Sequence, residues 1–335
     1  MKRWKLVLVA ISVLLLCACG NKKQVSGRVL AFENGILTVQ TEKGESYDFL
    51  VEDLKTTIFG LVGYENHEPL DSDCMVQVTW ERTQGQRIAE HIWVNARLRQ
   101  NVMQLSDGTP IDIWEHNGWR EYCLEDGTAL LMEEMPVGPD DNARWNELLY
   151  YEVFPEAAQQ GILDYYSKMG LRYNIASLLE DAWLVYDFSE EYNTKVVGQH
   201  VWVETWNDCI ICCQLNLTIP QERTNGYGES FCEGAVFDRE TGEQISNYDL
   251  FVLTPEKLED YLLDQLDHDG TLDRESIRLN LKPEQIVLRR DGGIDFFLAD
   301  RTEGDYRGML QIGLLPEQAR EILKPWAIIE PENNS

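Results

Sequence analysis

The stretch VSGRVLAFENGILTV, residues 25–39, decides the fold of the first part of the chain. It holds a β-rich run, the dipeptide Asn34-Gly35, and then Leu37 and Val39 alternating with polar residues. An Asn-Gly pair between such runs is the strongest short-range sign of a tight hairpin. The alternation returns after Lys43-Gly44 and continues to residue 94. We therefore predict a small, partly closed all-β barrel of five strands over residues 25–96.

Helix and strand signals are mixed over residues 110–328. Asn117-Gly118 and Asp126-Gly127 mark turns around two strands, and Pro155 is placed to open a helix that ends near residue 170. Thr254 is placed to cap another helix. Further helices are predicted at residues 174–187 and 316–323, and further strands at 201–218, 233–237, 285–288, 294–298 and 309–314. The whole chain is therefore expected to be α+β, with an antiparallel sheet and three to four helices in its second domain.

The two predicted domains are compatible with the length of 335 residues. Residues 96–109 between them are polar and suit a linker or the approach to a short hairpin. Residues 329–335 are expected to form a tail.

Residues 1–18 have the features of a signal peptide. A positively charged start at Lys2, Arg3 and Lys5 precedes an apolar run, residues 6–16, that is too short to cross a bilayer. An uncleaved anchor and an ordinary secretory signal are the alternatives. Each interpretation places the rest of the chain outside the cytoplasm.

The apolar run ends on Leu16-Cys17-Ala18-Cys19, which matches the bacterial lipobox. This pattern predicts that the Cys19 thiol receives diacylglycerol after cleavage and that residues 19–24 form a tether. The lipid bilayer is then a partner through Cys19 alone, because no later stretch approaches 18 apolar residues. We predict an extracytoplasmic body that is anchored to the membrane by its N-terminal lipid.

The chain is strongly acidic, with 58 carboxylates against 29 Lys and Arg residues and a formal net charge of −29. Three of the positive residues lie in the predicted signal peptide, so the mature body is more acidic still. This charge excludes nucleic acid as a partner and favours a cationic envelope protein or divalent ions. A generally acidic, solvated surface without a specific cationic ligand is the alternative.

Six cysteines follow Cys19, namely Cys74, Cys123, Cys209, Cys212, Cys213 and Cys232. An even number outside the cytoplasm permits disulfides, but a body of this length builds its own core, so buried thiols are predicted. Cys209 and Cys212 have the spacing of a chelating or redox pair. Strand alternation places Cys209 and Cys213 on one face and Cys212 on the other, which favours a structural role.

The first domain resembles small extracytoplasmic barrels of the OB-like type. The resemblance rests on Gly27-Arg28-Val29, Asn34-Gly35, Thr56-Thr57 and the closing strand at residues 89–94. It implies an OB-like barrel at the N-terminal side of the chain.

Residues 124–325 resemble the sensor domain of RsiV-type anti-sigma factors. The resemblance rests on the turn at residues 237–242, Asp249-Leu250-Phe251, residues 294–297, Tyr306-Arg307-Gly308, and the predicted helix at 316–323. It implies an extracytoplasmic binding module, and one branch of that family senses lysozyme.

Two departures limit what the resemblance implies. The family has a His in a Gly-Ala-His-Gly segment before the turn, whereas residues 228–234 lack that His. Only a few residues precede the apolar run, so we do not expect the chain to act as an anti-sigma factor.

No catalytic signature stands out. The five histidines, at 67, 91, 116, 200 and 268, have no metalloprotease spacing, and Ser230 lacks the second Gly of a nucleophile elbow. Phosphate loops and dinucleotide fingerprints are absent from the sequence. Paired carboxylates would suit a cell-wall glycan enzyme, but 58 acids make such pairs unavoidable. This carboxylate-dependent enzyme is the alternative to a binding function.

Residues 265–276 imitate a calcium loop, with Asp267, Asp269 and Asp273 at ligand positions around Gly270. Oxygen ligands around a central Gly suit Ca²⁺. The first and twelfth positions are Gln265 and Ser276 instead of carboxylates, so a solvated acidic turn without a cofactor is the alternative.

Trp202 and Trp206 lie in a polar strand context and are the aromatic residues we expect at a ligand surface. Tyr306, in the segment that carries the resemblance, is a third candidate. We predict a binding or sensing module without catalysis, whose ligand is an envelope protein or a peptidoglycan fragment.

Overall fold

The computed structural model describes residues 23–61, 69–134, 153–189, 191–225, 228–266, 281–302 and 305–331. The predicted signal peptide, Cys19 and residues 20–22 of the tether lie outside these ranges. No helix within them is long and apolar enough to span a membrane. The chain divides into two compact units, the first holding residues 1–99 and 114–117 and the second residues 100–113 and 118–335.

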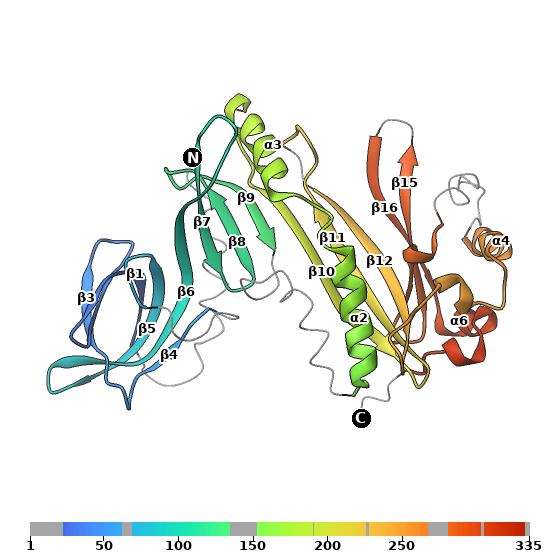
Figure 1. Cartoon of the computed structure of the whole chain (residues 1–335), viewed down its shortest axis with the longest axis horizontal. Coiled ribbons are helices and arrows are strands. Elements are labelled where there is room, and N and C mark those ends of the chain that lie inside the picture. The colour runs from blue at the N-terminus through green and yellow to red at the C-terminus, as the bar shows by residue number, and fades with distance from the viewer. Residues whose placement is uncertain are drawn as a thin grey trace. The chain divides into compact units, whose positions relative to one another are not determined.

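The first unit is a small β-barrel (Figure 1). Its strands are β1 (Lys23–Glu33), β2 (Ile36–Gln40), β3 (Ser46–Leu50), β5 (Cys74–Thr83) and β6 (Gln86–Gln104), with a short strand β4 (Thr57–Phe59) paired to β6. Pairing runs in a ring from β1 through β2, β3, β6 and β5 back to β1. The β3–β6 seam has a single register pair, Leu50 with Ile88. The predicted small all-β region is confirmed, and β4 is a sixth strand beyond the five that the prediction included.

Two glycine positions show why this sequence forms the barrel. Asn34 and Gly35 both have positive φ, as a tight hairpin between β1 and β2 requires. At Gly27 a side chain would collide with the backbone of Gln40, so only Gly permits the close approach of these strands. The apolar interior includes Val29, Leu37, Val39, Phe49, Val76, Val78 and Ile92.

The second unit is built on a sheet whose strands follow the chain order. They are β7 (Pro110–His116), of which only residues 110–113 belong to this unit, β8 (Trp119–Cys123), β9 (Ala129–Glu134), β10 (Lys195–Trp206), β11 (Ile210–Ile219), β12 (Glu229–Asp238) and β13 (Gln244–Ile245). The register of β9 with β10 is parallel, whereas β10, β11, β12 and β13 pair antiparallel. A parallel pair needs a long crossover. The crossover contains α2 (Glu156–Met169) and α3 (Ile175–Phe188).

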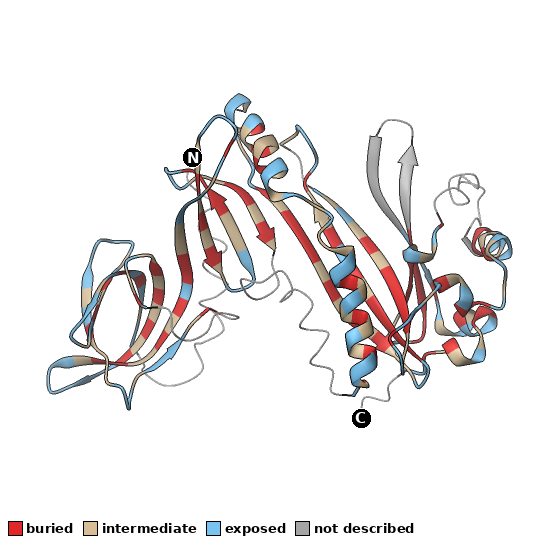
Figure 2. Cartoon of the chain, in the orientation of Figure 1, coloured by how far each residue is buried: buried red, intermediate tan, exposed pale blue. Residues whose placement is uncertain are grey.

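Both crossover helices cover the same face of this sheet. Val197 packs with α3, and Val201 and Val203 pack with α2, as alternation along β10 requires. Figure 2 shows the buried residues of the strands alternating with more exposed ones.

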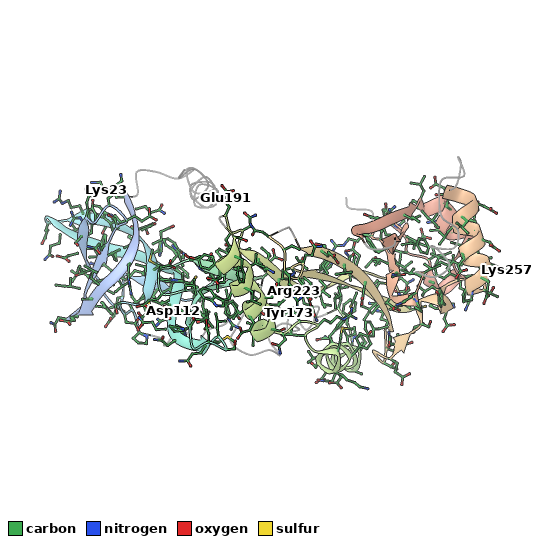
Figure 3. The ribbon with its side chains drawn as sticks, turned by 90° about the horizontal axis from the view of Figure 1, so that it is seen from above. Lys23, Asp112, Tyr173, Glu191, Arg223 and Lys257 are labelled. Carbon is green, nitrogen blue, oxygen red and sulfur yellow. The ribbon has the colours of Figure 1, made fainter. Side chains whose placement is uncertain are left out.

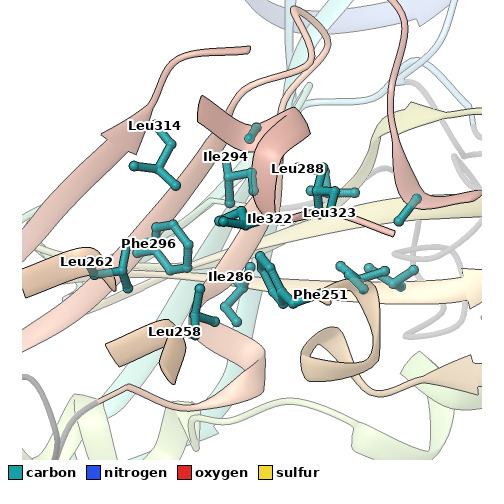
Figure 4. Packing of buried hydrophobic residues seen from close by; sticks show 14 of the residues in the cluster. Phe251, Leu258, Leu262, Ile286, Leu288, Ile294, Phe296, Leu314, Ile322 and Leu323 are labelled. Carbon is teal, nitrogen blue, oxygen red and sulfur yellow. The ribbon is translucent and has the colours of Figure 1, made fainter. Parts of the chain in front are cut away.

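A small sheet and two helices cover the other face over β11 and β12. They are β14 (Ile286–Leu288), β15 (Ile294–Thr302), β16 (Asp305–Leu314), α4 (Pro255–Leu266) and α6 (Pro316–Ile322). Figure 4 shows the apolar cluster that joins them, with Phe251, Ile286 and Phe296 among its members. At Gly234 a side chain would collide with the carbonyl of Ile286, so this Gly lets the two sheets meet.

The predicted α+β class is confirmed, and four α-helices lie within the described ranges. Several boundaries differ from the prediction. Residues 110–134 form three strands rather than two, and β6 continues to Gln104 where a linker was an alternative. Pro155 is the N-cap of α2 rather than its first residue.

The predicted strand at residues 201–218 is in fact two strands, β10 and β11. The Asn207 side-chain oxygen accepts hydrogen bonds from the backbone N–H groups of Cys209, at 2.8 Å, and Ile210, at 3.0 Å. This turn is made by an Asn side chain, so the chain reverses without the Gly or Pro that would have marked it.

The cysteines in the described ranges are free thiols. Cys212 packs towards the small sheet and Cys213 towards α2, so the predicted opposite facing of this pair is confirmed. Cys209 lies exposed in the turn rather than on the face of Cys213, because the turn ends the alternation. Burial raises the pKa of Cys213 and of Cys232, as expected for inert core thiols.

Candidate functional site

The two predicted tryptophans lie on opposite faces of β10. A bulge between Val203 and Thr205 interrupts the alternation, so Trp206 pairs with Ile211 and packs edge-on against Phe154, at 5.5 Å between ring centroids. Trp206 therefore belongs to the apolar layer beneath α2. An unbroken strand would have placed it on the face of Trp202.

Trp202 lies among polar side chains on the face of the sheet opposite α2 and α3. We call this region the Trp202 face; it comprises Glu134, His200, Trp202, Glu204, Gln214 and Asn216. Trp202 is the register partner of Gln214, and His200 is the partner of Asn216. Five of these side chains are half-buried, and Asn216 is exposed. No described helix packs on this face over β9 and β10 (Figure 1).

Glu204 holds the Trp202 ring in place. The indole N–H donates to the Glu204 carboxylate at 2.8 Å. The bulge turns the backbone carbonyl of Glu204 away from the sheet, where it accepts from Arg290 Nε at 2.7 Å. Arg290 Nε also lies 3.7 Å from the Glu204 carboxylate. The ring position is thus set by a polar chain of contacts rather than by apolar packing.

His200 and Glu134 form a second polar pair on this face. Their closest atoms, His200 Nε2 and a Glu134 carboxylate oxygen, are 3.5 Å apart. A Cβ at Gly198 would lie 2.8 Å from Glu134 Cβ and 3.3 Å from His200 Nε2. The glycine at this position leaves the space that the pair occupies. Beside it, the Gln214 amide donates to Asn216 at 3.2 Å.

Chemically, the Trp202 face offers one aromatic ring, two amide side chains, an imidazole and two carboxylates. An indole stacks on the apolar face of a sugar or attracts a cation, while amides and carboxylates orient hydroxyl and ammonium groups. These groups can stack on, and hydrogen-bond to, a polar ligand.

The buried face of the same strands carries a separate polar cluster beneath α3. Glu133 is 1% exposed and accepts from Tyr122 at 2.9 Å and from Tyr173 at 2.8 Å. Tyr173, labelled in Figure 3, lies just before α3. Burial and the Glu133 carboxylate raise the pKa of Tyr122. Lys195, also buried, pairs with Asp181 of α3. These contacts fasten the helix to the sheet.

The remaining predicted site residues are placed as follows. Tyr306 lies on β16, where it is the register partner of Arg301. Its side chain lies outside the part of the chain that the structure describes. Asp267, Asp269 and Asp273 lie outside the described residues, as does Cys19. Within the described ranges no group of three or more His, Cys, Asp or Glu residues is arranged to hold a metal ion.

Sequence reasoning missed Glu134, His200, Glu204, Gln214 and Asn216. The signal for His200 and Glu204 on β10, and for Gln214 and Asn216 on β11, is a spacing of two, with polar residues alternating against buried apolar ones, whereas Glu134 lies at the end of β9. That signal marks a half-exposed face, but the partners across strands depend on the register.

Known proteins resemble this chain only at low sequence identity. No family model matches the chain, and no curated protein matches it in sequence. It is similar to the solved structure of a DUF3298 family member from Bacteroides fragilis NCTC 9343, with 14% identity, a TM-score of 0.35, and coverage of 72% of this chain and 97% of that chain. It is also similar to a DUF3298 family protein from Pseudomonas aeruginosa PAO1, with 12% identity, a TM-score of 0.31, and coverage of 70% and 94%. These neighbours belong to a domain family of unknown function.

Proposed function

We propose that this chain is a membrane-anchored extracytoplasmic module that binds a cell-envelope ligand on the Trp202 face without converting it. The observation that carries the proposal is the half-buried indole of Trp202, fixed by Glu204 and bordered by Gln214 and Asn216. A ring held in place loses little freedom when a ligand stacks on it, so it binds at low entropic cost.

The charges of the face favour a ligand that carries positive groups. Glu134 and Glu204 both belong to it, and the whole chain has a net charge of −29. A cationic envelope protein or an amine-bearing cell-wall fragment fits this chemistry, since either would combine stacking on Trp202 with attraction to the carboxylates.

The binding experiment uses the full chain in a nonionic detergent. Calorimetric titration with soluble muropeptides and, separately, with lysozyme compares the parent chain with Trp202→Ala. The matched control is Trp93→Ala, which removes a half-buried strand tryptophan of the barrel that stacks on Phe59. We expect Trp202→Ala to weaken binding of one probe at least about tenfold and the control to leave it unchanged.

Equal affinities of Trp202→Ala and the parent chain would contradict the proposed face. Release of new reducing ends from peptidoglycan would contradict the non-catalytic part of the proposal and favour the carboxylate-dependent enzyme.

The anchor is tested independently of the ligand. Labelling growing cells with tritiated palmitate should mark the parent chain and leave a Cys19→Ala variant unlabelled, because Cys19 is the proposed acylation site. A variant that kept its label would place the lipid elsewhere.

A further inference from the structure

A group of cations and aromatic rings lies at one end of the barrel, in the first unit. Lys23 Nζ is 5.1 Å from the centroid of the Trp80 ring, and the Arg87 guanidinium is 5.4 Å from the same ring. The guanidinium is also 5.0 Å from the ring of Tyr47. Lys23 is labelled in Figure 3. Two positively charged groups therefore lie within 5.4 Å of the centroid of one indole ring.

Two hydrogen-bond donors in this group have no partner among the described residues. Trp80 is only 8% exposed, and its indole N–H is buried without a hydrogen bond. The Nε–H of Arg87 is also buried without one. A buried donor without an acceptor is costly, so two at one place indicate an acceptor that the described residues do not supply.

The cations of this group also lack carboxylate partners. Within the described residues neither Lys23 nor Arg87 forms an ion pair, whereas Arg97, Arg172 and Arg289 each bind a carboxylate. Glu45 accepts a hydrogen bond from the Tyr47 hydroxyl at 2.8 Å. The positive charge of this group is therefore not neutralised by a carboxylate of the described residues.

We propose that this end of the barrel binds a phosphate group. Lys23, Arg87 and the Trp80 N–H would supply two charges and the donors that a tetrahedral oxyanion accepts. A guanidinium that lies over two aromatic rings is held in position, and the Arg87 Nε–H has no hydrogen-bond acceptor among the described residues, which suits phosphate recognition.

Two sources of phosphate fit this chemistry. Lys23 follows Cys19 by four residues, so a chain anchored at Cys19 holds Lys23 within about 14 Å of the lipid. A lipid headgroup would then be close at hand. A soluble phosphate compound is the other source, and it requires no anchor.

The experiment follows the indole N–H resonance of Trp80 in the full chain labelled with ¹⁵N-tryptophan, assigned from a Trp80→Phe variant. One arm adds inorganic phosphate to the chain in nonionic maltoside micelles. The other places the chain in nanodiscs of phosphatidylglycerol without added phosphate. A downfield shift in the first arm supports a soluble phosphate ligand, and a shift in the second supports a headgroup.

Variants test which side chains form the site. Arg87→Gln and the exposed Lys23→Gln should each lower the affinity for phosphate about tenfold, as read from the concentration of phosphate that half-shifts the Trp80 resonance. The matched control is Arg82→Gln, because Arg82 is the register partner of Arg87 on the neighbouring strand and its Nε–H bonds the Gly85 carbonyl. If Arg87→Gln unfolds the barrel, Lys23→Gln still shows whether the cations of this group bind phosphate. An indole resonance that stays unmoved in both arms, or variants that match the control, would overturn the proposal.

Discussion

Glu133 and Glu134 are neighbours on β9, yet the sheet gives them opposite surroundings. Glu133 is 1% exposed and receives two tyrosine hydroxyls beneath α3. The Glu134 side chain is 45% exposed and meets His200 at 3.5 Å. The contrast separates the two faces of one sheet. Glu133 on the helix-covered face is satisfied from within the protein, whereas the Glu134–His200 pair on the Trp202 face is partly exposed to an external partner.

This difference predicts that the two faces respond differently to mutation. Removing a buried, hydrogen-bonded group leaves its partners unsatisfied and lowers the free energy of unfolding. Removing a member of an exposed pair changes that free energy little, because water replaces the lost partner. Substitutions on the helix-covered face should therefore affect stability, and those on the Trp202 face should affect ligand binding.

The largest expected effect is that of Glu133→Ala. It leaves the hydroxyls of Tyr122 and Tyr173 without their acceptor, and we expect the free energy of unfolding to fall by about 3 kcal/mol. Urea denaturation followed by circular dichroism measures it. The adjacent Glu134→Ala, as the matched control, should cost less than about 1 kcal/mol. Equal losses for the two variants would remove the contrast between the faces.

Alkaline pH provides the next test of the buried face. The pKa of Tyr122 is raised by burial and by Glu133, so the folded state keeps a proton that the unfolded state loses near pH 10. The stability that Tyr122 contributes is fully present below that pH and is lost as the pH rises further.

Urea midpoints between pH 8 and 11 should therefore decline less steeply for Tyr122→Phe than for the parent chain. Parallel pH profiles would contradict the assignment of this alkaline loss to Tyr122.

A binding effect of about 1.4 kcal/mol, or tenfold in affinity, is expected for Trp202→Ala. Its free energy of unfolding should change by less than that of Glu133→Ala, because Trp202 is half-buried and packs in no apolar cluster of the described residues. Calorimetry with the responding probe, muropeptide or lysozyme, and urea denaturation on the same samples check both parts. A variant that loses stability but keeps its affinity would show that Trp202 stabilises the fold and does not bind the ligand.

The smallest expected effect is that of Glu134→Gln. It keeps the shape of the side chain and removes one charge from the Trp202 face, so affinity for a cationic probe should fall about twofold to fivefold at low salt. Repeating the titration at 0.5 M NaCl should abolish the difference. A difference that persisted at high salt would show that the charge does not act through long-range attraction.

Much of the fold follows from local sequence signals, whereas of the site only Trp202 was predicted. Asn34-Gly35, Thr254 and the alternation along β10 identified turns, a cap and strands, because each depends on neighbours in the chain. The bulge at Glu204, which sends Trp202 and Trp206 to opposite faces, depends on pairing with β11 and on Arg290 from a distant hairpin. The meeting of Glu134 with His200 depends on the parallel register of β9 and β10.

One measurement tests the central claim most directly, that the ligand lies on the Trp202 face. Indole N–H resonances of the ¹⁵N-tryptophan-labelled full chain, assigned by single substitutions, are followed while muropeptides or lysozyme are added. The account predicts that the Trp202 resonance moves first and furthest with one of these probes, while Trp93 in the barrel stays in place. Binding that shifts other tryptophans and leaves Trp202 unmoved would contradict it.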